Sequence, residues 1–375
     1  MGNKILIRRK LLRLAERISR KTSFLDGLKT RLGISGFVLK ILAPPVKASE
    51  AAEIAKSFNT GLVSKKVEDC RKRGVVPDFW IVLVMSLGDI LACEPIPRRL
   101  KALAPDAKVH WIVLGQFAEA LEGNPYVDEV VKVASLTEGK EIASAKASGD
   151  GNAIVVDCHF DGTSCPATNR IFQNPANPAV NVHNYYAFGP LLGTFSLAAG
   201  LPISDDAPLF HLGAEFPQEL EQAFKAPCVV FHCHSSEKCR DLPDAKWNEM
   251  AARLTDAGVN VVEVGSVRAL AGRNGVFDFT GRRSLRKIAG AIDAAAVFVG
   301  IDSAFAHMAN AMRKQSVVIL GKFRNFESYF PYSGEFSRSR SFSVVRAPCG
   351  KPASCASVGE GVEAVLGKIA PPPPW

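Results

Sequence analysis

Alternation of strand-like apolar runs with helical segments is the feature that most constrains how this chain folds. The runs "FWIVLVMS", "KVHWIVL", "VDEVVKV" and "AIVVDCHF" follow one another from Asp78 onward, and the first three precede segments with helical spacing. A second series, "APCVVFHCH", "VNVVEVG", "AAVFVGIDS" and "QSVVILG", begins near residue 226. Runs that are apolar throughout are typical of strands buried on both faces. We therefore predict an α/β protein in which helices cover both faces of parallel sheets.

The two series are separated by a stretch rich in Pro and Asp. Residues 202–217, "PISDDAPLFHLGAEFP", show neither the helical nor the strand spacing of apolar residues, which is typical of an interdomain linker. With 375 residues, 47% of them hydrophobic, the chain has enough apolar material for more than one core. Ligands of such sheets bind beyond the carboxyl ends of the strands, so we expect the site in a cleft between domains. We predict a basic extension over 1–77, a first domain over 78–205 closed by a C-terminal helix over 357–369, and a second domain over 206–350.

Positive charge is concentrated at the N-terminus. Of the net charge of +9, residues 1–21 carry +7, because eight basic side chains stand against Glu16 alone. A nucleic-acid-binding protein would carry such charge along the folded face that contacts phosphates, so we expect no nucleic-acid partner. The basic side chains are Lys4, Arg8, Arg9, Lys10, Arg13, Arg17, Arg20 and Lys21.

The same segment has apolar residues at helical spacing, namely Ile7, Leu11, Leu14 and Ile18. A helix with cations between such residues is typical of a segment that lies on an anionic membrane surface. No apolar run in it approaches the roughly 18 residues that a membrane span needs, and its charges interrupt any signal-peptide core. We expect a cytoplasmic protein, peripheral to the inner face of the plasma membrane. A basic helix packed on the protein itself and a disordered tail are the alternatives.

The cysteines favour a reducing compartment. Their number, nine, is odd and no CxxC pair occurs, which argues against a secreted disulfide framework. The clusters "FHCHSSEKC" and "CGKPASC" match no well-known zinc spacing. We therefore expect no metal ligands among them.

Three loops at predicted strand ends carry polar residues. In the first, Gly88 permits a tight turn and Asp89 follows at the start of a helix. The carboxylate of Asp89 is interpreted either as an N-cap, which accepts hydrogen bonds from free helix amides, or as a general base whose pKa is raised by a cleft of low dielectric. The two roles are compatible.

The second loop, "HSSEKCRDLPDAKW", places hydroxyl groups and cations between a strand and the next helix. Such side chains converge with the free amides of the helix and favour binding of an anion. A solvated loop with accidental charges is the alternative. The residues of this predicted anion site are Ser235, Ser236, Lys238 and Arg240.

In the third loop, "GIDSAFAHMANA", Asp302 and Ser303 begin a helix, and His307 lies about one and a half turns further along. Taken alone, these residues are interpreted as helix caps and a buried core histidine. Their place at a strand end, shared with the other two loops, favours a common binding site.

Four segments resemble glycosyltransferase family 9, typified by the heptosyltransferases of lipopolysaccharide assembly. The likeness covers roughly residues 80–368. It implies the GT-B fold, in which two Rossmann-like domains with parallel sheets face a central cleft, and transfer of a sugar with inversion from a nucleotide-sugar donor, with no cofactor or essential metal. In chain order the segments are "GDILACEPIPRRLKALAPDAKVHWIVLGQFAEALEGNPYVDEVV", "FDFTGRRSLRKIAGAIDAAAVFVG", "GIDSAFAHMANAMRKQSVVILG" and "APCGKPASCASVGEGVEAVLGKI".

The resemblance implies roles for the residues that match its motifs. Asp89 would take the proton from the acceptor hydroxyl, and His307 would help to fix the donor loop. Ala304 stands where the family usually has Gly, so we expect an altered backbone approach to the diphosphate. The predicted donor site comprises Ser235, Ser236, Lys238, Arg240, Gly265, Asp302, Ser303, Ala304 and His307.

The Asn- and Pro-rich segment 158–190 is an unusual loop on the acceptor side of this pattern. We expect saccharide contacts from it, and a packed surface loop is the alternative. The expected acceptor contacts are Gly88, Arg170, His183, Asn184 and Tyr185.

These expectations describe a glycosyltransferase that adds a sugar to a lipid-linked or cell-surface saccharide at the cytoplasmic membrane face. Two alternatives are a degenerate protein of the same fold that only binds nucleotide sugar or glycan, and a sugar-nucleotide epimerase. A nicotinamide-dependent dehydrogenase is disfavoured, because no strand is followed by Gly-x-Gly-x-x-Gly.

Overall fold

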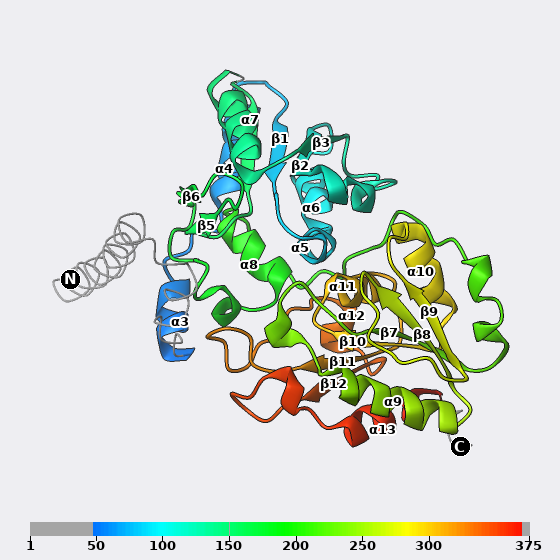
Figure 1. The fold of residues 1–375 in the computed structure, drawn as a ribbon. Coiled ribbons are helices and arrows are strands. Elements are labelled where there is room, and N and C mark those ends of the chain that lie inside the picture. Colours follow the sequence, from blue (N-terminus) through cyan, green and yellow to red (C-terminus); the bar gives the residue numbers. More distant parts are fainter. Residues whose placement is uncertain (1–47, 150, 370–375) are drawn as a thin grey trace, which may run out of the picture.

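The computed structural model describes residues 48–149 and 151–369. They form two α/β units, the first above the second in Figure 1. Each unit is built on one parallel sheet, as the alternation of strands and helices predicts. The helix predicted over residues 1–21 lies outside the described residues.

The first sheet has four strands in the order β3-β2-β1-β4. Central β1 is buried on both faces: Trp80 and Val82 pack with residues of α7, whereas Phe79 and Ile81 pack with residues of α4 and α6. This double burial explains why the strand is apolar throughout. The bounds are α4 Leu62–Lys72, β1 Asp78–Val82, α6 Pro95–Leu103, β2 Lys108–Leu114, β3 Glu129–Val133, α7 Leu136–Gly149 and β4 Ala153–Asp157.

The second sheet has six strands in the order β12-β11-β10-β7-β8-β9. Helices α9 and α13 cover one face, and α10 and α11 pack against the other. The bounds are β7 Cys228–His232, α9 Asp244–Asp256, β8 Asn260–Gly265, β9 Val276–Thr280, α10 Leu285–Ala294, β10 Val297–Ile301, α11 Ala304–Ala311, β11 Ser316–Leu320, β12 Phe342–Arg346 and α13 Val358–Ile369.

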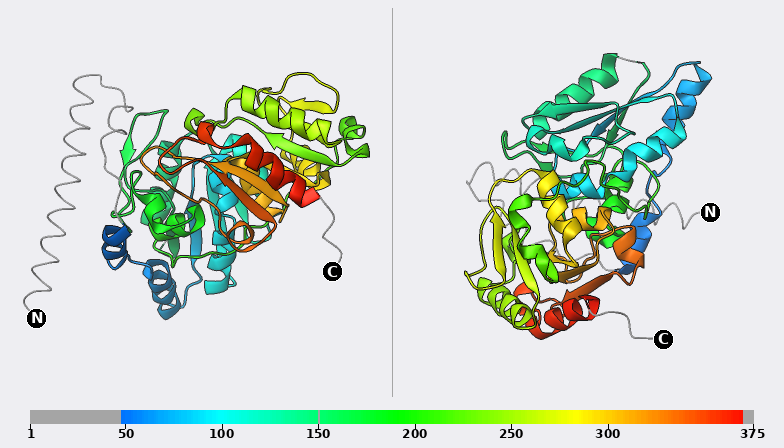
Figure 2. Two further views of the ribbon diagram at one scale, coloured as in Figure 1. Left: turned by 90° about the horizontal axis from the view of Figure 1, so that it is seen from below. Right: turned by 90° about the vertical axis from the view of Figure 1, so that its right-hand side faces the viewer.

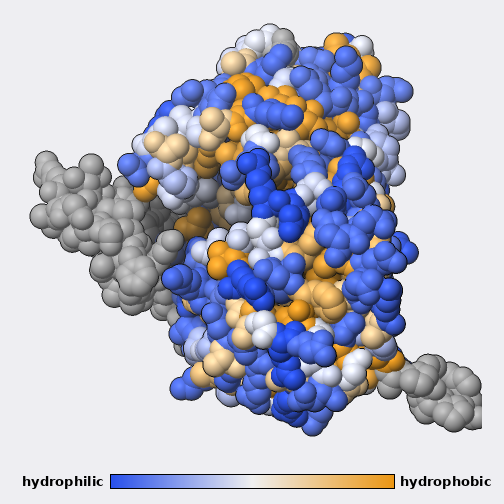
Figure 3. Space-filling view, turned by 45° about the vertical axis from the view of Figure 1, so that its right-hand side comes forward, coloured by the Kyte–Doolittle hydropathy of each residue, from blue (hydrophilic) through white to orange (hydrophobic). Residues whose placement is uncertain are grey.

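Shorter elements connect these layers, and no helix in the described part of the chain is long and apolar enough to cross a membrane. The face drawn in Figure 3 is largely hydrophilic, with smaller hydrophobic areas between. The shorter elements are α3 Ala48–Ala55, α5 Leu87–Ala92, η1 Gly115–Leu121, β5 Thr163–Ser164, β6 Ile171–Phe172, η2 Tyr185–Phe188, α8 Leu191–Ala198, η3 Gln218–Leu220, η4 Ala223–Lys225, η5 Lys238–Arg240, α12 Glu335–Arg338 and η6 Ala353–Cys355.

The first unit begins before the boundary that the sequence predicts at residue 78. Helix α4 contacts β4, and its buried residues Val63, Val67 and Cys70 belong to the core beneath the first sheet. The predicted extension over 1–77 is therefore wrong for α4. Most other residues of this helix are charged, and its buried stripe consists of three residues. So short a stripe did not distinguish the helix from a linker in the sequence alone.

Helix α13 does not close the first domain, as the sequence predicted. It packs beside α9 on the second sheet, where the two helices lie together in Figure 2. Val358, Val362 and Val365 are buried there in the core of the second unit. An amphipathic pattern shows that a helix has a buried face but not which sheet covers it, and this prediction is wrong for that reason.

The two units meet where α5 packs on α11. A Cβ atom at Gly88 would lie 3.2 Å from Cδ2 of His307 and 3.3 Å from Cα of Ala304. Only a residue without a side chain fits this approach without displacing its neighbours. The loop before α5 is thereby held against the start of α11, and the carboxyl ends of β1 and β10 face each other.

We expect Gly290→Ala in α10 to lower the free energy of unfolding by about 1–3 kcal/mol, because the new methyl group would meet the backbone oxygen of Glu215 at 2.0 Å. Gly367→Ala in α13 is the matched control: nothing lies within 4 Å of that Cβ, and alanine favours helix by up to about 1 kcal/mol. Urea denaturation of the two variants should give opposite signs. Equal effects would contradict the packing of α10 on residues 215–216.

Candidate functional site

Asp89 lies in the first turn of α5 and faces the second unit. The N-cap of α5 is Ser86, so the prediction of Asp89 as the N-cap is wrong. Asp89 is the third residue of the helix and completes a capping box, in which its Oδ2 accepts a hydrogen bond from the backbone N–H of Ser86 at 3.1 Å. Burial raises the pKa of this carboxyl to about 6, against the lowering influence of Arg240 and of the Ser86 amide. A carboxyl group with such a pKa is poised to accept a proton near neutral pH.

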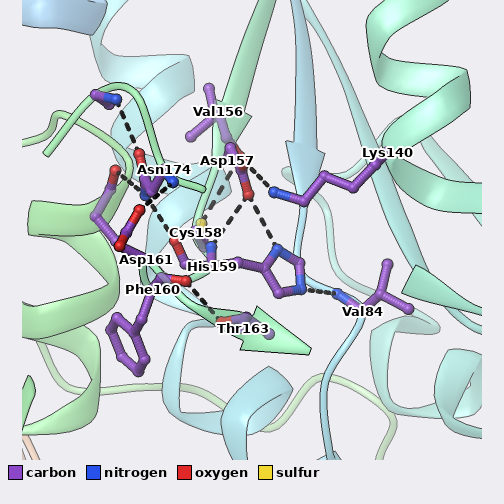
Figure 4. Close-up of polar contacts among 12 residues, drawn as sticks. Val84, Lys140, Val156, Asp157, Cys158, His159, Phe160, Asp161, Thr163 and Asn174 are labelled. Atoms are coloured by element: carbon purple, nitrogen blue, oxygen red, sulfur yellow. Dashed lines mark hydrogen bonds and ion pairs between the residues drawn. The ribbon is translucent and has the colours of Figure 1, made fainter. Parts of the chain in front are cut away.

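A buried polar network holds the strand end that leads to Asp89. The backbone N–H of Val84 donates to Nε2 of His159 at 3.2 Å, and Nδ1 of His159 lies 3.0 Å from Oδ1 of Asp157. Because an amide can only donate, His159 carries its proton on Nδ1 and donates it to Asp157. Lys140 from α7 forms an ion pair with the same carboxylate (Figure 4). The ends of β1 and β4 are thus tied together beside the Asp89 loop.

Across the contact between the units, Asp302 is almost fully buried and surrounded by donors. Its Oδ2 lies 3.1 Å from Nη1 of Arg240 and accepts a hydrogen bond from the Tyr329 hydroxyl at 2.9 Å. The Tyr332 hydroxyl lies 3.5 Å from Oδ1. Burial opposes the charged form of Arg240, but Asp302 outweighs it and raises the pKa of the guanidinium. Arg240 and Asp302 therefore form a fixed ion pair across the contact from Asp89.

Two histidines near Asp302 are held neutral. Ser303 is the N-cap of α11, and its hydroxyl also lies 2.8 Å from Nδ1 of His232. Burial lowers the pKa of His232 to about 3 and that of His307 to about 4, so both rings are uncharged at neutral pH. Nδ1 of His307 is buried with no hydrogen-bond partner. Gly265, with φ +139°, packs directly against the His232 ring.

Ala304 is the first residue of α11 and has no positive φ, so alanine adopts the observed conformation freely. The expected altered approach to a diphosphate stays a prediction. The backbone of Ala304 lies beside Gly88 at the contact between the units.

The predicted anion loop is only partly free to bind a ligand. The single hydroxyl hydrogen of Ser235 stays within the loop, where the Glu237 carbonyl and the Asp241 carboxylate each lie 3.0 Å from the oxygen, and the oxygen accepts from the Glu237 N–H at 3.1 Å. Ser235 therefore shapes the loop, and its hydrogen is already engaged. Ser236 and Lys238 are exposed, whereas Arg240 points to Asp302.

One protein-family model matches part of the chain. The model of "Glycosyltransferase family 9 (heptosyltransferase)" matches residues 175–344. Over these residues the chain is similar to glycosyltransferase family 9, which supports a glycosyltransferase. The matched range contains the loops around Arg240 and Asp302 but not Asp89, so the role of Asp89 rests on its geometry. A search of curated proteins gives no match.

Three solved structures share the GT-B fold, which confirms the predicted architecture. The glycosyl transferase family 9 protein from Veillonella parvula DSM 2008 aligns with a TM-score of 0.55 and 15% identity, over 78% of this chain and 97% of its own. E. coli heptosyltransferase WaaC with ADP aligns with a TM-score of 0.54 and 16% identity, over 78% of this chain and 99% of its own. E. coli ADP-heptose lps heptosyltransferase II aligns with a TM-score of 0.55 and 16% identity, over 78% of this chain and 98% of its own.

The expected acceptor contacts of this family 9-like chain divide into two groups. Tyr185 and His183 lie on the loop beside the contact between the units: Tyr185 packs on Phe326 with ring centroids 5.2 Å apart, and the His183 carbonyl accepts from Asn325 at 2.6 Å. Asn184 is buried and shapes its own loop by donating to the Ala179 carbonyl.

Arg170 forms the second group. It is exposed on the short hairpin of β5 and β6, where its guanidinium contacts Glu141 of α7 at 3.0 Å. Its expected contact with the acceptor stays a prediction.

Sequence reasoning missed residues 323–332, "FRNFESYFPY", which cross from the second unit to the first-unit loop. Phe323 and Tyr329 pack on Tyr186, and the charge of Arg324 lowers the pKa of Asp89. The aromatic density of this stretch was a signal that pointed to an interface.

The described ranges contain no group of three or more His, Cys, Asp or Glu side chains arranged to hold a metal. A cavity of about 740 Å³ lies at the amino ends of the first sheet, lined by Asp78, His110 and Glu129 among others. It lies at the sheet edge opposite Asp89, and we assign it no part in the site.

We expect Asp157→Asn to lower the free energy of unfolding by about 2 kcal/mol at neutral pH. Burial alone would raise the pKa of Asp157, but His159 and Lys140 outweigh it and lower the pKa to about 2, from an ordinary 3.8. The stabilisation is therefore complete above pH 3.8 and is lost as the pH falls toward 2. Urea denaturation at several pH values measures it. Asp256→Asn, at an exposed ion pair, should change little, and a pH-independent deficit in Asp157→Asn would contradict the assignment.

Proposed function

We propose that this chain is an inverting, metal-independent glycosyltransferase that moves a sugar from a nucleotide-sugar donor to a hydroxyl group of a lipid-linked or cell-surface saccharide, such as a lipopolysaccharide precursor. The observation that carries the proposal is the juxtaposition of Asp89 on the first unit with Arg240 and Asp302 on the second. The first unit is assigned to the acceptor and the second to the donor.

In this mechanism Asp89 takes the proton from the acceptor hydroxyl. The oxygen attacks the anomeric carbon, the bond from that carbon to the diphosphate breaks with its electron pair on the departing phosphate oxygen, and the configuration inverts. A pKa of about 6 matches this task, because the carboxylate is ionised near neutral pH yet basic enough to accept a proton.

The second unit is assigned to the leaving group. Arg240 supplies positive charge, and neutral His232 and His307 bring no competing charge. Positive charge and fixed dipoles at the developing anion are the usual way to stabilise such a leaving group. Ser303, at the N-terminus of α11, and the exposed Ser236 are the hydroxyl groups assigned to the donor.

Asp89→Asn should lower the transfer rate by roughly 100-fold or more while nucleoside diphosphate affinity stays within about twofold. In the wild type, kcat/KM should rise with pH and level off above about pH 6, since the ionised form is the active one. Product formation and isothermal titration calorimetry check the two parts, with exposed Asp106→Asn as a control of unchanged activity. Transfer that survives in Asp89→Asn would remove the base from the mechanism. Acceptor-independent conversion of the donor would favour the epimerase alternative.

We also propose that residues 1–21 hold the enzyme at the inner face of the plasma membrane, close to a lipid-linked acceptor. The support is the charge of +7 interleaved with apolar residues at helical spacing. Tethering would raise the effective concentration of the acceptor.

Deletion of residues 1–21 should abolish sedimentation with vesicles that contain phosphatidylglycerol, because the segment carries most of the net positive charge. Vesicles of phosphatidylcholine alone serve as the control and should bind neither form. Binding of the deleted form equal to that of the full chain would remove the tether.

A further inference from the structure

A tight turn over residues 323–326 carries a strained arginine. The backbone N–H of Phe323 donates to the Phe326 carbonyl at 3.0 Å, and the reverse bond is 2.8 Å long. Between them Arg324 has φ +52°, in the left-handed region that favours glycine and asparagine. Such backbone persists only where the surroundings hold it, and it is frequent at binding sites.

Contacts from both units hold this turn in place. Asn325 donates from its side-chain amide to the His183 carbonyl on the first-unit loop at 2.6 Å. The Phe326 ring packs edge-on against both Tyr185 and Tyr186, with ring centroids 5.2 Å apart in each case. Arg324 is therefore fixed at the boundary between the acceptor and donor units.

Two guanidinium groups share one aromatic ring at this boundary. The central carbon of Arg240 lies 4.0 Å from the Phe323 ring centroid, and that of Arg324 lies 4.9 Å from it. Stacking on the ring fixes both planar groups and leaves their N–H donors directed to the side.

The carboxylate partners of the two arginines differ in exposure. Arg240 pairs with Asp302, whose side chain is 2% exposed and is also bound by Tyr329. Arg324 pairs with Glu237, whose side chain is 39% exposed. An exposed pair exchanges its partners at little cost, whereas a buried one is expensive to open. Glu237 belongs to the anion loop, whose backbone Ser235 holds in place independently of the Glu237 carboxylate.

We propose that Arg324 binds the diphosphate of the nucleotide-sugar donor, and that Glu237 occupies its guanidinium until the donor arrives. This inference rests on the proposed function and adds a specificity-determining residue to its donor site. The donor displaces one carboxylate, and a charge-assisted pair with phosphate replaces the exposed pair with Glu237. Arg240 keeps Asp302 as its partner throughout. The lowering of the Asp89 pKa by Arg324 agrees with this position.

The test is isothermal titration calorimetry of the full chain with ADP, GDP, UDP and inorganic pyrophosphate. Arg324→Gln should weaken binding of the preferred ligand roughly tenfold, because one charge-assisted contact is lost. Glu237→Gln should tighten it, because the competing carboxylate is removed. Arg273→Gln, at an exposed ion pair with Asp256, is the matched control and should leave affinity unchanged.

A merely structural ion pair predicts the same sign for both substitutions, and that result would overturn the inference. Arg324→Gly guards against misfolding, since glycine adopts the observed φ freely: thermal stability should hold or rise while affinity still falls. Unchanged affinity in Arg324→Gln and Arg324→Gly, with clear wild-type binding, would remove Arg324 and leave the proposed function intact. Failure of the wild type to bind any of the four probes would overturn both.

Discussion

The direct packing of α5 on α11 is the contact on which the rest of the site depends. Because Gly88 has no side chain, the first turn of α5 approaches the start of α11 closely enough that a Cβ would touch His307. Any side chain at position 88 would press on His307 and on the backbone of Ala304. The absence of a side chain at Gly88 therefore permits the close approach that places Asp89 opposite Arg240.

This approach also explains the electrostatics of Asp89. Two arginines lie near enough to lower its pKa, yet burial dominates and the pKa is raised to about 6. Asp302, the partner of Arg240, raises the pKa of Asp89 and so offsets part of the lowering by that arginine. Without Asp302, Arg240 would favour the ionised carboxyl more strongly and make it a weaker base.

Much of this arrangement was predictable from the sequence, because it depends on local patterns. Both parallel sheets and the loop carrying Asp89 follow from apolar runs that end in Gly, Ser and Asp. Long-range packing was not predictable: α13 has an amphipathic pattern that fits either sheet, and Arg170 and Arg324 are both arginines in loops whose neighbours the sequence does not show. Only the fold shows that one of these arginines contacts α7 and the other lies at the boundary between the units. Helix α4 was missed because its apolar stripe is short and most of its other residues are charged.

Ion pairs in the second unit divide into those that define the site and those able to respond to a ligand. Asp302 is buried in its pair with Arg240, and loss of that arginine would leave the Asp302 charge unpaired in the protein interior. We therefore expect this ion pair to stay closed when a ligand binds. The pair of Arg324 with Glu237 is partly exposed, so water or phosphate can solvate either partner when it opens. Because the two guanidinium groups share the Phe323 ring, a ligand that engages Arg324 lies beside the fixed charge of Arg240. A diphosphate, with charge on two adjacent groups, matches this pair better than a single carboxylate does.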